Sequence, residues 1–311
     1  MKTYKNLIHN NITLEKCKSI IVRAAKHKHK RNSVKKVLEN IDYYALKLYE
    51  MVLRDKYDFK PTHTFKINEY GKERTITSAP FFPNQCIDYL MLECGFRDII
   101  LSKCHFQQFG NVIGKGGFKG KKHIERHLPK YRYFLKFDIK KYYENIDKTI
   151  LLNQIKRIVS DKKFIYLITQ MLENQKDKGL TIGSIASQYL ALFYIKDFVG
   201  WLNHKCKLLV NYVDDFLVVG NNKRHLKYLI NEISIYLSSL NLKLNKKTII
   251  YGINQRFISM LGFRFKKKLT ILRKKILNHI YTTKNLICYK GWVFSSNCYK
   301  IKLRLYYNKG A

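Results

Sequence analysis

Two neighbouring carboxylates, Asp214 and Asp215, lie between two apolar runs at residues 208–213 and 216–219. Runs rich in Val, Leu and Phe on both sides of a short polar centre predict a β-hairpin with the acids at its tip. Adjacent aspartates repel one another and resist burial unless a cation holds them. The pair therefore predicts either a solvated hairpin tip or a site for a divalent metal ion.

A third acid, Asp138, follows the apolar, strand-like run at residues 133–137. Acids at the ends of adjacent strands, with no His or Cys nearby, indicate hard oxygen ligands of the kind that Mg²⁺ prefers. Two such ions support in-line phosphoryl transfer, because they stabilise both the attacking and the leaving oxygen. The three acids therefore suggest a metal site, and a solvated hairpin tip stays the alternative at this point.

Further motifs surround these acids in a fixed order. They are FLKFDIKKYYENID at 134–147, GLTIGSIASQ at 179–188, YVDD at 212–215, LKLNKKT at 242–248 and FISMLGFRF at 257–265. In content and order they resemble motifs A to E of reverse transcriptases. The resemblance covers roughly residues 60–270, and five ordered motifs argue against a chance match.

This resemblance implies an α/β (α+β) right-hand polymerase fold, with an antiparallel sheet in the palm, fingers, and a small helical thumb. The expected divisions are a basic helical extension at 1–57, fingers at 58–130, palm with interleaved fingers helices at 131–255, a primer-grip hairpin at 256–270 and a small basic thumb at 271–311. Within them, residues 58–82 alternate like a hairpin with a turn at Tyr70 and Gly71. Residues 223–240 carry a helical apolar stripe.

The implied activity is RNA-directed DNA polymerisation with two Mg²⁺ ions, Mn²⁺ being the alternative. The resemblance makes Asp138, Asp214 and Asp215 the catalytic carboxylates and metal ligands, with the backbone carbonyl of Ile139 as a further metal ligand. Two other acids near motif A have different expected roles: Asp147 begins a helix and Glu144 lies on the surface.

A second group of residues is expected at the incoming nucleotide. By resemblance these are Lys72, Arg74, Tyr143, Ile182, Gly183, Gln188 and Lys247. Tyr143 lies five residues after Asp138, where the family places a steric gate against the ribose 2′-hydroxyl. Tyr142 is the neighbouring alternative and the better core residue, and Lys246 is the alternative to Lys247.

The segment at residues 105–122 is rich in glycine and lysine. Glycines such as Gly110 permit close approach of the backbone to a partner, and the segment does not match a P-loop. It predicts a contact to the phosphates of template or primer, the alternative being a flexible loop. The expected nucleic-acid-binding residues are Lys115, Lys119, Lys121, Lys122 and Gly262, the last as the turn of the primer-grip hairpin.

Motif B indicates a subclass. Most reverse transcriptases read QGxxxSP, whereas this chain has Ile182 in place of Gln and Gln188 in place of Pro. The IGxxxSQ pattern resembles the enzymes of diversity-generating retroelements, which misincorporate opposite template adenine. The resemblance then implies a template RNA, an RNA/cDNA duplex, deoxynucleotides and a small basic oligomeric accessory protein as partners. A retron, group II intron-like or antiviral-defence reverse transcriptase is the alternative, and a non-catalytic RNA-binding scaffold is an alternative of another class.

Composition agrees with a polyanionic partner. The 311 residues hold 60 Lys and Arg against 22 Asp and Glu, a formal net charge of +38. Such an excess strains a compact fold by self-repulsion, and nucleic acid relieves it. Seven cysteines without a CxxC pair argue against zinc and against a disulfide framework. With no signal peptide and no membrane-spanning run, we expect a cytoplasmic protein encoded by a bacterium, an archaeon or a phage.

Overall fold

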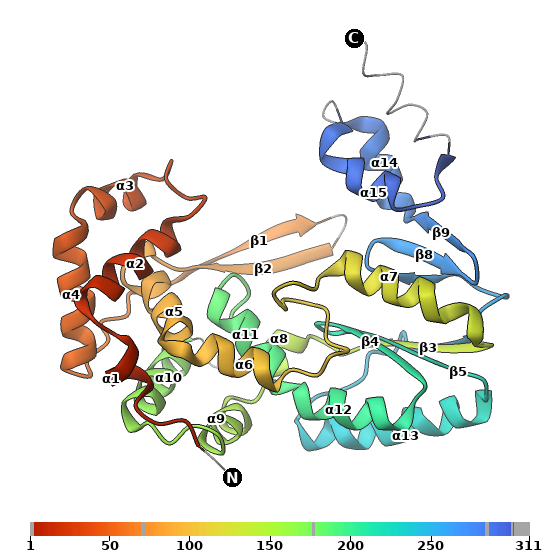
Figure 1. The fold of residues 1–311 in the computed structure, drawn as a ribbon, viewed down its shortest axis with the longest axis horizontal. Coiled ribbons are helices and arrows are strands. Elements are labelled where there is room, and N and C mark those ends of the chain that lie inside the picture. Colours follow the sequence, from red (N-terminus) through yellow and green to blue (C-terminus); the bar gives the residue numbers. More distant parts are fainter. Residues whose placement is uncertain (1–2, 70–71, 176–177, 284–285, 300, 302–311) are drawn as a thin grey trace. The chain divides into compact units, whose positions relative to one another are not determined.

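The computed structural model describes residues 3–69, 72–175, 178–283, 286–299 and 301. The chain forms two compact units, each assembled from separate stretches of sequence (Figure 1). Unit 1 comprises Met1–Cys104, Lys141–Lys196 and Ser239–Leu242, and unit 2 comprises His105–Lys140, Asp197–Ser238 and Lys243–Ala311.

Unit 1 is mainly helical. Its helices are α1 (Leu7–Asn11), α2 (Leu14–Ala25), α3 (Asn32–Glu39), α4 (Ile41–Leu53), α5 (Cys86–Met91), α6 (Arg97–Lys103), α8 (Tyr142–Asn145), α9 (Lys148–Lys156), α10 (Lys162–Asn174) and α11 (Ile185–Tyr194), with irregular helical turns at Phe81–Gln85 and Leu92–Phe96. Helix α2 begins after Thr13, whose hydroxyl accepts the backbone N–H of Lys16 at 3.1 Å, a standard N-cap. The core includes Phe96, whose ring centroid lies 4.6 Å from that of Phe164.

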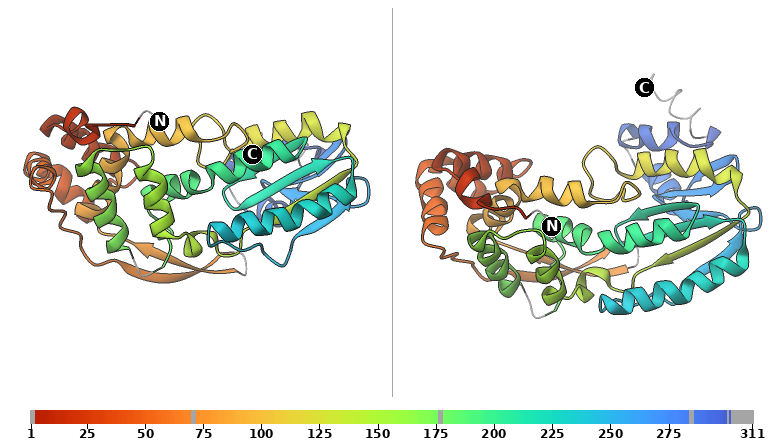
Figure 2. Two further views of the ribbon diagram at one scale, coloured as in Figure 1. Left: turned by 90° about the horizontal axis from the view of Figure 1, so that it is seen from below. Right: turned by 60° about the horizontal axis from the view of Figure 1, so that its bottom comes forward.

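Unit 1 also carries an exposed hairpin. Strands β1 (His63–Glu69) and β2 (Lys72–Ser78) pair antiparallel, which confirms the hairpin expected from residues 58–82. Figure 2 shows it as a two-stranded ribbon along one edge of the helices of unit 1. The expected turn at Tyr70 and Gly71, and the side chain of Lys72, lie outside the described residues.

Unit 2 is built on strands. It contains β3 (Tyr133–Asp138), β4 (Leu208–Tyr212), β5 (Asp215–Gly220), β6 (Ile249–Gly252), β7 (Ile258–Met260), β8 (Phe263–Lys266) and β9 (Leu269–Leu272), with helices α7 (Gly117–His127), α12 (Lys196–Lys205), α13 (Lys223–Ser239), α14 (Lys274–Thr282) and α15 (Lys290–Phe294) and short 3₁₀ turns at Leu128–Lys130 and Leu286–Tyr289. Helix α13 confirms the helical stripe expected at 223–240.

The main sheet of unit 2 has the order β4-β5-β3-β6, and every pairing is antiparallel, as expected for a palm. Side chains alternate between its two faces. On one face Phe134 and Leu217 join a core with α7 and β7–β9. On the other, Phe137 stacks on Phe216 at 4.8 Å, and Phe216 meets Phe198 of α12 at 5.5 Å. The sheet is therefore covered on both faces, with α12 and α13 on one side and α7 on the other (Figure 1).

A three-stranded sheet, β7-β8-β9, forms the rest of this core. Its first turn is Leu261-Gly262, with φ angles of 54° and 80°, the geometry of a tight hairpin. Gly262 is therefore a turn residue, as expected. In the region expected to form the thumb, Trp292 of α15 stacks on Phe263 at 5.0 Å.

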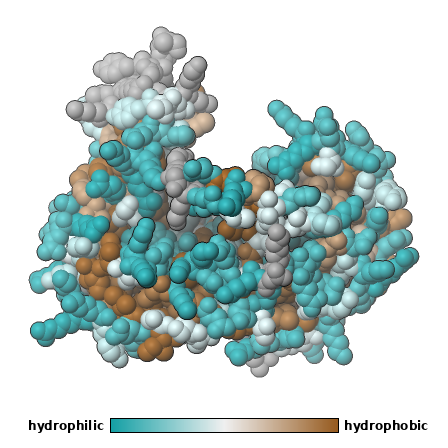
Figure 3. Space-filling view, turned by 180° about the vertical axis from the view of Figure 1, so that it is seen from behind, coloured by the Kyte–Doolittle hydropathy of each residue, from teal (hydrophilic) through white to brown (hydrophobic). Residues whose placement is uncertain are grey.

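The molecular surface combines hydrophilic and apolar side chains. The face in Figure 3 is largely hydrophilic, with apolar side chains scattered between. Among the described residues, no helix combines the length and the apolar character needed to cross a membrane.

Candidate active site

The strands of the main sheet bring two of the predicted acids together. Asp138 is the last residue of β3 and Asp215 is the first residue of β5, and the antiparallel register places them directly opposite one another. Asp214 lies in the two-residue turn between β4 and β5. The predicted hairpin is confirmed, although Asp215 belongs to the strand rather than to the tip.

The turn that carries Asp214 is tightly held. Val213 has a φ of 60°, a left-handed conformation that β-branched residues rarely adopt. A Cβ atom on Gly110 would lie 2.7 Å from Val213 Cγ2 and 2.8 Å from Val213 N. The N–H of Phe109 donates to the carbonyl of Asn211 at 2.9 Å. The close approach that Gly110 permits is therefore to this turn, which corrects the expectation of an external partner at this glycine.

Lys136 supplies positive charge beside the acids. It precedes Asp138 by two residues and so shares its face of the strand. Its ammonium lies 2.5 Å from Asp215 Oδ1, and the side chain of Asp215 is 25% exposed. Burial raises the pKa of Asp215, while Lys136 and then Arg273 act to lower it and Asp138 acts to raise it. The carboxylate is therefore only partly compensated.

Asp138 is positioned by the segment that follows α13. Its Oδ2 accepts a hydrogen bond from Asn245 Nδ2 at 3.0 Å, and its backbone carbonyl accepts the N–H of Asn245 at 3.0 Å. The N–H of Ile139, a buried residue, donates to the carbonyl of Asp214 at 3.1 Å. These bonds fix the end of β3 against the Asp214 turn. That Ile139 offers its own carbonyl to a metal stays a prediction.

The donor set suits a hard divalent cation. Within the described part of the chain, no group of three or more His, Cys, Asp or Glu side chains forms a ready-made metal site. Asp138 and Asp215 nevertheless face one another across the sheet, and both are oxygen donors. Opposed carboxylates whose charge Lys136 and Arg273 compensate only in part would be stabilised by Mg²⁺ or Mn²⁺. The residues therefore fit the metal that the motifs imply.

A cavity of about 390 Å³ in unit 2 borders these acids. Its lining includes Asp214, Asp215, Tyr212, Arg273 and Trp292. The backbone N–H of Arg273 donates to the carbonyl of Gly262 at 3.0 Å. Its buried Nε has no hydrogen-bond partner among the described residues. An unsatisfied cationic donor beside the acids could meet a phosphate.

Most of the residues expected at the incoming nucleotide belong to unit 1. Tyr142 is buried and its hydroxyl donates to the carbonyl of Ala191 at 2.6 Å, which makes it a core residue, as expected. Tyr143 is half-buried and its carbonyl accepts the N–H of Leu180 at 2.8 Å. Arg74 and Gln188 are exposed. The gate assignment to Tyr143 stays a prediction.

The motif B loop is fixed to β2. The N–H of Thr77 donates to the carbonyl of Ile182 at 3.0 Å. Gly183 follows with a φ of 119°, and a Cβ there would lie 2.7 Å from the carbonyl oxygen of Thr77, so only glycine suits this position. Ser184 then caps α11 by accepting the N–H of Ser187 at 3.1 Å. The helix expected after a glycine turn is confirmed.

The lysines expected to contact nucleic acid or the triphosphate differ in their exposure. Lys119, Lys122 and Lys247 are exposed. Lys115 donates to the carbonyl of Phe106 at 2.7 Å. Lys121 is different, because it is buried and pairs with Glu125 at 2.6 Å. Since its ammonium is occupied within the fold, this placement disfavours a phosphate contact by Lys121.

Two expectations about surface acids are confirmed. Asp147 caps α9 by accepting the N–H groups of Thr149 and Ile150 at 2.9 and 3.0 Å. Glu144 is exposed and pairs with Lys141 at 2.7 Å. Both acids are therefore assigned to structure rather than to catalysis.

Comparison with known proteins decides the family. Residues 84–265, more than half of the chain, match the family described as reverse transcriptase (RNA-dependent DNA polymerase). The chain belongs to the reverse transcriptase family. That family is described by its RNA-dependent DNA polymerase activity. No curated protein matches it.

Solved structures of telomerase share the fold of this reverse transcriptase. Apo telomerase of Candida tropicalis without its C-terminal domain has a TM-score of 0.52 and 15% identity, over 74% of this chain and 60% of that chain. Apo telomerase of the same organism has a TM-score of 0.51 and 15% identity, over 75% and 53%. Its complex with the TWJ fragment of telomeric RNA has a TM-score of 0.52 and 16% identity, over 70% and 45%. The reverse transcriptase thus spans about half the length of these telomerase chains.

Three residues near the acids were not expected from the sequence, namely Lys136, Asn245 and Arg273. For Lys136 a signal existed, because residues two apart in a strand share a face. Asn245 lies inside motif D, but its hydrogen bond to Asp138 depends on the register of chain segments far apart in sequence. Arg273 follows β9 and carries no local signal.

Proposed function

We propose that this reverse transcriptase copies a template RNA into cDNA within a diversity-generating retroelement, with errors concentrated opposite template adenine. The observation that carries the proposal is Ile182 at the start of motif B, with Gln188 at its end. The hydrogen bond that fixes the motif B loop to β2 at Ile182 supports a direct role for Ile182 in shaping the nucleotide site.

The acids at the sheet provide the polymerising chemistry. Asp138, Asp214 and Asp215 are the proposed ligands of two Mg²⁺ ions, which when bound activate the primer 3′-hydroxyl and stabilise the leaving pyrophosphate. Asn245 orients Asp138 through its amide. Lys136 holds Asp215 in place through its ammonium. Precise positioning of the reacting groups accounts for most of such catalysis.

The remaining site residues select and hold the substrates. Tyr143 is the proposed gate that excludes the ribose 2′-hydroxyl, and Lys72, Arg74 and Lys247 are proposed contacts to the triphosphate. Exposed lysines of the glycine-rich segment, with Gly262 of the hairpin turn, are proposed to hold template and primer. The partners are then a template RNA, an RNA/cDNA duplex, deoxynucleotides and a small basic oligomeric accessory protein.

The proposed cause of the errors is the loss of a polar contact. Ile182 has an aliphatic side chain that is half-buried. Glutamine at this position could donate a hydrogen bond near the nascent base pair, whereas isoleucine cannot. A site without such a bond rejects wrong pairs less well.

Deep sequencing of cDNA tests this proposal. Wild-type enzyme, Ile182→Gln and the aliphatic control Ile182→Val copy one RNA that contains all four bases, with any accessory protein supplied. We expect wild-type errors mainly opposite adenine. Ile182→Gln should restore a bond of about 1 kcal/mol and lower those errors several-fold, while Ile182→Val leaves them unchanged.

The outcomes distinguish the proposed function from its alternatives. Wild-type errors spread evenly over the four template bases would remove the diversity-generating assignment and favour a retron, intron-like or defence enzyme. Errors focused on adenine that persist in Ile182→Gln would keep the class and discard Ile182 as the cause. Asp214→Ala should abolish primer extension but leave RNA binding intact. Extension by this variant at wild-type rate would remove Asp214 from the proposed active site, whereas wild-type protein that binds RNA without extending a primer would favour the RNA-binding scaffold.

A further inference from the structure

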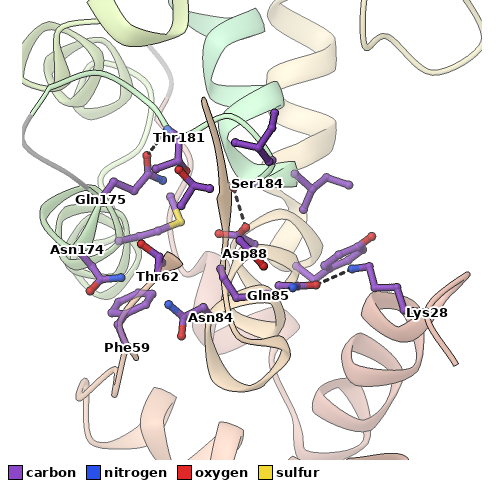
Figure 4. Close-up of a pocket in the computed structure, with 18 of the residues that line it drawn as sticks. Lys28, Phe59, Thr62, Asn84, Gln85, Asp88, Asn174, Gln175, Thr181 and Ser184 are labelled. Atoms are coloured by element: carbon purple, nitrogen blue, oxygen red, sulfur yellow. Dashed lines mark hydrogen bonds between the residues drawn. The ribbon is translucent and has the colours of Figure 1, made fainter. Parts of the chain in front are cut away.

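A cavity of about 300 Å³ lies within unit 1, lined by residues from the segment between α2 and α3, the β1–β2 hairpin, α5, α10 and the motif B loop. Its volume is at the lower end of the range for small-molecule sites. In Figure 4 Asp88 lies near the middle of the labelled lining residues, with Lys28 and Phe59 on opposite sides. The polymerase chemistry proposed above uses none of these three residues.

Asp88 is an under-compensated acid in this cavity. The residue is 8% exposed. Among the described residues its carboxylate has one hydrogen bond, from the Ser184 hydroxyl at 2.7 Å, and no ion pair. Burial raises the pKa of Asp88 to about 7, although Ser184 and Lys28 act to lower it. A buried carboxylate with one neutral donor still has acceptor capacity for N–H groups.

Among the described residues that line the cavity, the amides of Asn84, Gln85 and Gln175 are engaged with the protein, and Asn174 is exposed. Asn84 exchanges two hydrogen bonds with the backbone of Lys60. Gln85 accepts from Lys28 and donates to the carbonyl of Ala79. Gln175 accepts the N–H of Thr181. Asp88 is therefore the buried polar group of the cavity with the most hydrogen-bonding capacity left for a ligand.

The other walls suit a flat ring. The apolar and aromatic lining residues include Phe59, Phe65, Ile76, Met171 and Ile185. Phe65 is 49% exposed on β1, so its ring can accept a stacked base. Aromatic stacking and hydrogen bonds to the base edge are the usual means of recognising unpaired RNA bases.

Positive charge extends from this cavity into a neighbouring one. Lys28 and Arg31 line the first cavity. A second cavity of about 430 Å³ shares Arg31 and Gln85 with it and adds Lys36, Lys60 and His63. Cations that continue past the first cavity can meet several phosphates in a row, as a polynucleotide presents them.

We infer that the Asp88 cavity binds an unpaired guanine nucleotide of an RNA. Guanine is the base whose Watson–Crick edge offers two neighbouring N–H donors, N1–H and N2–H, to one carboxylate, and the other bases do not. The inference rests on the proposed function, because it requires an RNA partner. The nucleotide belongs to a fixed part of that RNA, since a template being copied passes all four bases through any one point.

Mononucleotide binding tests the base preference. GMP, IMP, 1-methyl-GMP and AMP are titrated into the full-length Asp214→Ala protein at pH 7.5 in EDTA, which disables the proposed polymerase site. We expect GMP to bind at least tenfold more tightly than IMP, which lacks the 2-amino group, because hydrogen bonds to charged groups are strong. 1-Methyl-GMP and AMP should bind more weakly still. Equal affinities for all four nucleotides would overturn the inference.

A protein variant provides the second arm. Asp88→Asn keeps the acceptor for Ser184 but replaces one carboxylate oxygen by a donor, so GMP should bind at least tenfold more weakly. Asp98→Asn, at an exposed acid of α6, is the matched control and should bind GMP normally. Unchanged GMP affinity in folded Asp88→Asn would contradict the assignment. The nucleotide comparison stands even where this variant fails to fold.

Short RNAs distinguish a polynucleotide from a free nucleotide. The RNA UUGUU should bind more tightly than GMP and more tightly than UUAUU. The double variant Lys36→Ala, Lys60→Ala should bind this RNA more weakly but bind GMP normally. RNA no tighter than GMP would make the RNA assignment wrong. Primer extension on a homopolymer template distinguishes this inference from the proposed function. Normal extension by a protein that binds GMP no better than AMP refutes only this inference. Absent extension by a protein that prefers GMP refutes only the proposed polymerase.

Discussion

Each of the two units holds an aspartate whose pKa is raised by burial, and the two acids differ in what compensates their charge. Asp215 of unit 2 lies 2.5 Å from the ammonium of Lys136 and faces a second acid, Asp138. Asp88 of unit 1 receives one neutral hydrogen bond from Ser184 and lies among apolar walls. Burial is the largest cause of the raised pKa in both.

The difference teaches that burial of an acid does not by itself define its role. Two opposed carboxylates of which one pairs with an ammonium leave room for a further cation, which is the chemistry of a metal site. A single carboxylate with a hydroxyl donor and no ion pair leaves room for N–H donors. The surrounding partners, rather than the pKa shift, separate a metal ligand from a base-reading residue.

The largest expected effect is on catalysis. Asp215→Asn should lower the rate of primer extension roughly 10³-fold or more, because the metal contribution to phosphoryl transfer is several kcal/mol. The fold should survive, since the substitution removes a poorly compensated charge. Glu144→Gln, an exposed acid near motif A, is the matched control. Extension by Asp215→Asn at the rate of that control would remove Asp215 from the metal site.

The second-largest expected effect is on the pH dependence of the free energy of unfolding, through Asp88. In the folded state Asp88 keeps its proton up to about pH 7, because burial raises its pKa to about 7. In the unfolded chain the carboxyl loses that proton near its ordinary pKa of 3.8. Between these values the folded state binds more protons, so the free energy of unfolding falls as pH rises. This loss is up to about 4 kcal/mol. Urea unfolding of Asp88→Asn should therefore show greater stability than wild type at pH 8 and nearly equal stability near pH 3.

A pH-independent difference between Asp88→Asn and wild type would contradict this account of Asp88. Asp98→Asn is again the control, because that acid is exposed and its substitution should leave the pH dependence of unfolding unchanged.

The smallest effect concerns the turn that carries Asp214. Gly110→Ala places a methyl group against Val213, so we expect a loss of about 1–3 kcal/mol in the free energy of unfolding, as for other overpacked sites. Gly117→Ala is the matched control, since a Cβ there meets nothing within 4 Å. Equal urea midpoints for the two variants would show that the turn adapts without strain.

Much of the acid site could be predicted from the sequence. The apolar runs around Asp214 and Asp215 and before Asp138 predicted strands, and their motifs placed them in one family. The alternation of side chains along a strand also places Lys136 on the same face as Asp138. Asn245 and Arg273 could not be found in this way, because their proximity to the acids depends on pairing between segments far apart in the chain.

Unit 1 was less predictable. The hairpin, α4 and the cap of α11 follow from local patterns. Asp88 had no motif around it, and its burial arises from packing of α5 against the motif B loop. Lys121 shows the same limit in unit 2, because a lysine within a basic run is buried by its pairing with Glu125.

The most direct test compares Asp215→Asn and Asp88→Asn in two assays on the same preparations, primer extension on an RNA template and binding of GMP in EDTA. The account predicts crossed results: Asp215→Asn loses extension but binds GMP normally, and Asp88→Asn extends primers normally but loses at least tenfold in GMP affinity. Parallel losses in both assays for either variant would contradict the claim that Asp215 and Asp88 serve separate functions.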